Sequence, residues 1–90
     1  MTKIQWTLNA AQDIAYWKKH DAKKYERIKL LIKNIQESPF TGIGKPEPLK
    51  HSLAGLWSRR INHEHRLIYS VNSVNSGQII IYNCRFHYIK

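Results

Sequence analysis

The sequence has few acidic residues and only one cysteine. Its 90 residues include 6 Asp and Glu against 15 Lys and Arg, which gives a formal net charge of +9. The single cysteine, Cys84, can form no intramolecular disulfide and supplies no pair of thiolates for a zinc site. These absences exclude a small secreted fold held together by disulfides. They are typical of a reducing compartment, so we expect a cytoplasmic protein.

The sequence also has no long hydrophobic run. It begins with MTKIQW and continues with polar and charged residues, without the apolar segment of a signal peptide or the roughly 18 apolar residues of a membrane-spanning helix. Hydrophobic residues nevertheless make up 42% of the chain, which is enough for one small core. We therefore expect residues 1–90 to form a single domain that makes no contact with a membrane. Its positive charge indicates a polyanionic partner, either nucleic acid or an acidic protein.

The hydrophobic pattern divides the chain into two helices and several strands. Residues 3–7 alternate between polar and apolar and predict a short strand, Asn9 is expected to cap a first helix, and Asp21 a second helix that Pro39 ends. A loop rich in proline and glycine follows at 38–48, and three further strands are predicted at 56–62, 65–71 and 78–88. This order predicts an α+β domain in which two N-terminal helices pack on one face of a mainly antiparallel twisted sheet.

The odd and even positions of the central hairpin predict which side chains share a face. If Ile61 and Leu67 face the helices, Arg60 and Arg66 emerge together on the opposite, open face. This requires an odd number of residues in the connecting turn. In the last strand, apolar residues occupy both odd and even positions, so periodicity does not decide which face holds His87. Taken singly, either arginine is as readily interpreted as an ordinary solubilising residue.

An acid, an imidazole and arginines are the groups that cleavage of RNA through its own 2′-hydroxyl requires. A base removes the hydroxyl proton, a cation stabilises the charge that accumulates on the phosphate, and an acid protonates the departing 5′-oxygen. We expect neither a metal nor another cofactor. His63 and His65 form an H-x-H pair, but in a turn and without a third ligand, so we interpret them as surface histidines rather than zinc ligands.

Four runs of residues resemble a known family. In chain order they are KPEPLKH at 45–51, LWSRRI at 56–61, EHRLIY at 64–69 and CRFHY at 84–88. Through these runs, the chain closely resembles the YoeB/Txe toxins of the RelE superfamily over nearly its whole length. The resemblance implies a RelE-like, microbial-ribonuclease-like fold. It also implies a toxin of a bacterial type II toxin-antitoxin module that cuts mRNA in the ribosomal A site and so inhibits translation.

The same resemblance implies roles for individual residues. The general base of the family falls on Glu47, its phosphate-stabilising arginine on Arg66 and its general acid on His87. The residues expected to bind substrate are Lys45, Lys50, Arg59, Arg60 and Tyr88. The implied partners are mRNA, the 70S ribosome and a small acidic antitoxin of the YefM/Axe type, and the toxin is expected to be a homodimer.

Two other functions stay open from the sequence. A basic module that binds RNA or the ribosome without catalysis would have the same excess of positive charge. A DNA-binding repressor would have it too, but the basic second helix has no accompanying helix-turn-helix pattern. The non-catalytic module is therefore the main alternative to the nuclease.

Overall fold

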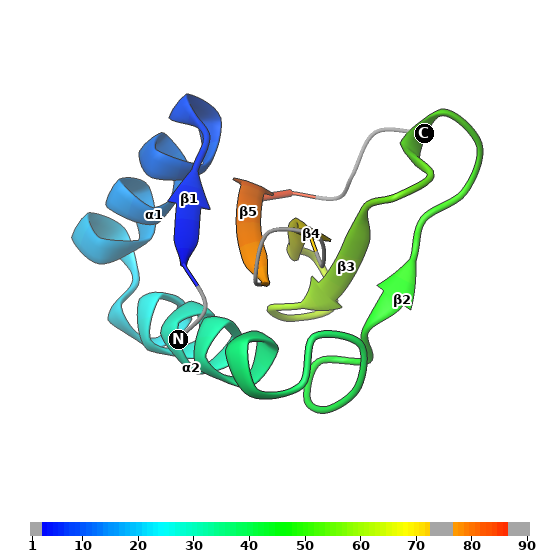
Figure 1. Ribbon diagram of the computed structural model, residues 1–90. Helices are drawn as coiled ribbons and strands as arrows, with labels where there is room; N and C mark the ends of the chain where they lie inside the picture. Colours follow the sequence, from blue (N-terminus) through cyan, green and yellow to red (C-terminus); the bar gives the residue numbers. More distant parts are fainter. Residues whose placement is uncertain (1–2, 73–76, 87–90) are drawn as a thin grey trace.

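The computed structural model describes residues 3–72 and 77–86, and it forms one layer of helices against one sheet (Figure 1). His87 and Tyr88 lie outside the described residues. The elements are β1 (Ile4–Trp6), α1 (Leu8–His20), α2 (Ala22–Glu37), β2 (Glu47–Pro48), a 3₁₀ turn (His51–Leu53), β3 (Trp57–Arg60), β4 (Arg66–Asn72) and β5 (Gln78–Asn83). In this part of the chain, no helix is both long and apolar enough to cross a membrane.

The sheet has five strands in the order β1-β5-β4-β3-β2. β2, β3, β4 and β5 pair antiparallel with their neighbours, whereas β1 runs parallel to β5 with Ile4 opposite Ile79. Both helices lie on one side of the sheet (Figure 1). The predicted α+β architecture is thus confirmed. The short strand β2 was not predicted and lies at the end of the stretch that we expected to be a loop.

Side chains at the start of each helix explain where the helices begin. The hydroxyl of Thr7 accepts the N–H of Ala10 at 3.1 Å, so Thr7 caps α1 and the prediction that Asn9 does so is wrong. Thr7 is held there because its hydroxyl also donates to the Tyr82 carbonyl at 2.8 Å. Asp21 caps α2 as predicted, since its carboxylate accepts the N–H of Lys24 at 3.2 Å.

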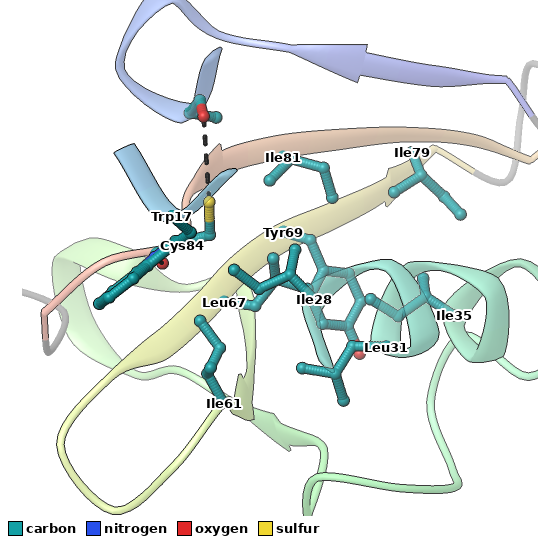
Figure 2. Packing of buried hydrophobic residues seen from close by; sticks show 11 residues of the cluster. Trp17, Ile28, Leu31, Ile35, Ile61, Leu67, Tyr69, Ile79, Ile81 and Cys84 are labelled. Atoms are coloured by element: carbon teal, nitrogen blue, oxygen red, sulfur yellow. Dashed lines mark hydrogen bonds between the residues drawn. The ribbon is translucent and has the colours of Figure 1, made fainter. Parts of the chain in front are cut away.

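The core lies between α2 and the centre of the sheet. Figure 2 shows side chains from α2 packed against side chains from β4 and β5, and all of them are buried: Ile28, Leu31, Ile35, Leu67, Tyr69, Ile79 and Ile81. Trp17 of α1 closes the end of this cluster, where its indole N–H donates to the Cys84 carbonyl at 2.8 Å. The helices therefore cover one face of the sheet and leave the other face uncovered.

Candidate active site

The register of the sheet decides which charged side chains share the open face. Arg60 lies opposite Arg66 in the β3–β4 pair, and Glu47 lies opposite Ser58 in the β2–β3 pair. Paired residues share a face, as do alternate residues along one strand, so the glutamate and both arginines lie on the face away from the helices. The predicted sharing of one face by Arg60 and Arg66 is confirmed. The connection between them, 61–65, has the odd number of residues that the prediction required.

The structure also decides the assignment that periodicity left open in β5. Ile79 and Ile81 are fully buried in the core, so the odd positions of this strand face the helices. Tyr82 faces the other way, and its hydroxyl lies 3.0 Å from that of Ser70. β5 ends at Asn83, and His87 lies outside the described residues, so its face stays undecided.

Arg60 and Arg66 bring two positive charges together. Nη1 of Arg66 donates to the Asn62 carbonyl at 2.7 Å and to the His65 carbonyl at 3.2 Å, so the turn holds this half-buried guanidinium in place. Arg60 is exposed. Within residues 3–72 and 77–86, neither arginine forms an ion pair. Like charges directly across a strand pair repel each other, and an anion bound between them would remove that cost.

Glu47 lies in the edge strand β2, beside a cavity of about 540 Å³ that residues 47–53 line. Its carboxylate is exposed, and so are the side chains of Lys45 and Lys50 on either side of β2. Leu49 is buried between them and anchors the segment to the rest of the domain. A carboxylate and two ammonium groups are thus presented to solvent from a segment that is itself held in position.

Arg59 is fully buried, and its side chain points toward the helices. It donates hydrogen bonds to five acceptors: the Tyr69 hydroxyl, Oδ1 of Asn34 and the carbonyls of Ser38, Thr41 and Ile43. Burial raises the pKa of the Tyr69 hydroxyl, which stays protonated and donates to the Pro39 carbonyl at 2.7 Å. The prediction that Arg59 binds substrate is therefore wrong, because no part of its guanidinium reaches solvent.

His65 is likewise not the surface residue that we predicted. Only 7% of it is exposed, and its ring meets that of Trp17 edge to face, with centroids 4.8 Å apart. Its Nδ1 accepts the N–H of Phe86 at 2.7 Å. His65 has the same odd parity as Leu67 and Tyr69, which was the signal for its burial. No group of three possible metal ligands occurs in the described part of the chain.

Comparison with known proteins decides the family. The sequence model described as "YoeB-like toxin of bacterial type II toxin-antitoxin system" matches residues 6–88. Toxin YoeB of Synechocystis is 50% identical over 86 residues, which cover 96% of this chain and 96% of that protein. The chain belongs to the YoeB toxin family. It is accordingly a toxin of a type II toxin-antitoxin system.

Solved structures of YoeB toxins have the same fold. A YoeB/ParE toxin from Agrobacterium tumefaciens is 46% identical, superposes with a TM-score of 0.91, and the match covers 96% of this chain and 99% of that one. YoeB of Staphylococcus aureus, 42% identical with a TM-score of 0.87, was solved as a dimer, where the match covers 97% of this chain and 98% of that one. It was also solved as a heterotetrameric complex with YefM, where the match covers 98% and 99%.

Proposed function

We propose that this YoeB toxin is an endoribonuclease that cleaves mRNA in the ribosomal A site and so stops translation in the cytoplasm. The observation that carries the proposal is the shared face of Glu47, Arg60 and Arg66. One carboxylate and two guanidinium groups without ion pairs, within the described residues, suit a phosphodiester with an ionisable hydroxyl beside it. A module that only binds RNA would need the cations but not the carboxylate.

In the proposed reaction, Glu47 accepts the proton of the 2′-hydroxyl, and the 2′-oxygen attacks the adjacent phosphorus. Arg66, assisted by Arg60, stabilises the negative charge that builds up on the phosphate oxygens. The bond from phosphorus to the 5′-oxygen then breaks, and His87 donates a proton to that oxygen. The products are a 2′,3′-cyclic phosphate and a 5′-hydroxyl. These steps use protein groups alone.

The partners follow from the charge of the molecule and from its relatives. Lys45, Lys50 and Tyr88 would hold the nucleotide around the scissile phosphate, and the ribosome would bend the mRNA so that the 2′-oxygen lies in line for attack. The YoeB–YefM complex of S. aureus supports an antitoxin of the YefM/Axe type. The positive charges of Lys50, Arg60 and Arg66 suit a small acidic antitoxin that covers the surface around them. The S. aureus dimer supports a homodimer.

A translation extract with end-labelled message tests the activity. The wild-type toxin should produce discrete cuts in phase with codons, and Glu47→Gln should slow them by about 10²-fold to 10⁴-fold, the usual contribution of a positioned base. Glu37→Gln is the matched control, because it removes the same charge from an exposed residue at the end of α2 and should cut at the wild-type rate. Intact message in the presence of bound, folded toxin would favour the non-catalytic module instead.

A further inference from the structure

Phe86 has an unusual backbone conformation for its type. Its φ is +65°, in the left-handed region that residues with a β-carbon rarely adopt, and 57% of the residue is exposed. Burial of the aromatic ring therefore does not explain the strain. Backbone strain of this kind persists only where surrounding contacts impose it, and it clusters at functional sites. Lys45 and His51, on either side of the candidate base Glu47, are the other non-glycine residues with positive φ in the described part of the chain.

Both backbone groups of Phe86 are held by neighbouring residues of the central hairpin. Its N–H donates to Nδ1 of His65 at 2.7 Å, and its carbonyl accepts the N–H of Arg66 at 2.9 Å. The two bonds attach one peptide segment to two consecutive residues. We refer to these three residues, His65, Arg66 and Phe86, as the backbone clamp.

Contacts other than the hydrogen bond with Phe86 hold His65 in position. The backbone N–H of His65 donates to Oδ1 of Asn62 at 2.7 Å, and its carbonyl accepts the N–H of Ile61 at 3.0 Å. The ring packs edge to face on Trp17 of the core. Since Nδ1 accepts a hydrogen bond, the ring is neutral and carries its proton on Nε2.

We propose that His65 is a positioning residue for the general acid. By accepting the N–H of Phe86 it imposes the left-handed conformation, and this conformation sets the direction in which the chain leaves Phe86, the residue that precedes His87 in the sequence. Arg66 holds the carbonyl of the same residue, so the clamp connects the phosphate-stabilising arginine with the acid. The inference rests on the proposed function, in which His87 protonates the 5′-oxygen.

Three substitutions of His65 distinguish the loss of its hydrogen-bond acceptor from the loss of the volume of its ring. His65→Asn places an oxygen close to the position of Nδ1 and keeps the hydrogen bond. His65→Gln carries its oxygen one bond further along and loses it. His65→Leu fills most of the volume with no acceptor. Asn is thus the rescue variant, and Gln is a second loss variant in case Leu disturbs the packing on Trp17.

Hydrogen exchange at the amide of Phe86 tests the clamp without any measurement of activity. This amide should be protected in the wild type and in His65→Asn, and should exchange at least about 10-fold faster in His65→Gln and His65→Leu. Amides in the middle of β4 and β5 should be unchanged in all four proteins. Equal protection of Phe86 in every variant would overturn the proposal, because the bond to His65 would then not hold this residue.

Single-turnover cleavage on saturating ribosome complexes tests the positioning. His65→Leu and His65→Gln should cut about 10-fold to 10²-fold more slowly with unchanged ribosome affinity, since a displaced catalytic group costs rate rather than binding. His65→Asn should restore most of the rate. A role in stability alone would instead give losses that follow the melting temperature of each variant, and that result would contradict the proposal.

A double-mutant cycle with His87→Gln identifies the group through which His65 acts. If His65 acts by placing His87, His65→Leu should have no further effect on cleavage once His87 has been replaced. If the rate losses of His65→Leu and His87→Gln instead add in full, the positioning role is contradicted and the proposed reaction is unaffected. Wild-type activity of His87→Gln would contradict the proposed acid itself, so the two failures are distinguishable.

Discussion

Arg59 and Arg60 are consecutive in β3, yet one is fully buried and the other exposed. A buried cation is tolerated only when its hydrogen-bonding groups are satisfied, and Arg59 achieves this with carbonyls, an amide oxygen and a hydroxyl. Arg60 faces Arg66 on the open side, where an anion can reach both. Because side chains alternate between the two faces of a strand, Arg59 supports the fold and Arg60 is available to bind an anion.

The guanidinium of Arg66 should matter for its shape as well as its charge. Arg66→Lys keeps the positive charge but loses the planar fork that can donate two hydrogen bonds to one phosphate. We expect single-turnover cleavage on ribosomes to slow by about 10²-fold, the usual contribution of one oxyanion donor, with nearly unchanged ribosome affinity. A rate within a factor of two of the wild type would show that Arg66 acts only as a point charge.

Cys84 should be almost unreactive in the folded protein. Burial, with a smaller effect of the nearby Asp13 carboxylate, raises the pKa of its thiol from 9.0 to about 12. At pH 8 the folded protein should then alkylate about a thousandfold more slowly than the chain unfolded in urea, because only the thiolate reacts. Time courses of iodoacetamide labelling measure this ratio.

The same shift fixes the sign of a pH effect on stability. The unfolded chain releases the thiol proton near pH 9, before the folded protein does. The free energy of unfolding should therefore be unaffected by Cys84 below pH 9 and fall as the pH rises toward 12. Cys84→Ala, compared with the wild type by urea melts across this range, should lack that part of the fall, and an identical pH dependence in both proteins would contradict the shift.

At the scale of elements, the segment between α2 and β2 is a loop fixed by β3. The guanidinium of Arg59 binds three carbonyls of this segment, and the N–H of Arg60 donates to the Gly44 carbonyl at 2.7 Å. Gly44 has a φ of +81°, and a β-carbon there would lie 2.9 Å from the side chain of Leu31. These contacts hold the backbone that leads to Lys45 and Glu47 in one conformation. The two-residue strand β2 then fixes the position of Glu47 beside β3.

Removal of the Arg59 side chain should release this loop. Arg59→Leu leaves buried carbonyls without donors, and we expect it to lower the free energy of unfolding by roughly 3 kcal/mol or more. Arg60→Leu is the matched control in the same strand and should change stability by less than about 0.5 kcal/mol, as exposed substitutions usually do. Urea denaturation of both variants checks the difference, and similar midpoints would contradict the role of Arg59.

The sequence allowed α2, the hairpin and the open face to be predicted, because each depends on a local period. It did not allow Arg59 and His65 to be placed, although both have the odd parity of Leu67. The family resemblance assigned Arg59 to substrate binding, and the position of His65 in a predicted turn favoured the surface. Both side chains are buried instead, because partners far away in the sequence, the Ser38 carbonyl and the Phe86 N–H, satisfy their polar groups. The parallel pairing of β1 with β5 was also not predicted, because periodicity within a strand does not say which strand lies beside it.

At the scale of the whole molecule, a net charge of +9 on 90 residues creates a field that attracts any polyanion. Attraction alone does not align an RNA 2′-oxygen with its phosphorus. The open face presents one carboxylate in β2 and arginines in β3 and β4. The proposed function assigns this alignment to the ribosome.

Cleavage should therefore depend strongly on the ribosome. We expect naked RNA to bind with the salt dependence of a basic protein and to be cut at least about 10²-fold more slowly than the same message in a ribosomal A site, because a bound but flexible strand is seldom in line. Parallel time courses at equal toxin and RNA concentrations give the ratio. Equal rates would mean that the toxin aligns its substrate unaided.

The pairing of β1 with β5 has a consequence for how the chain is made. β1 precedes every other helix and strand in the described part of the chain, but its partner in the sheet is residues 79–81, so the sheet is incomplete during synthesis until those residues have been added. The central strand β4 also lacks one of its two neighbours until then. A ribosome that is translating this message thus carries an unfinished sheet until it has added β5. The open face that would carry the proposed nuclease site is therefore complete only after every element from β1 to β4 has been made.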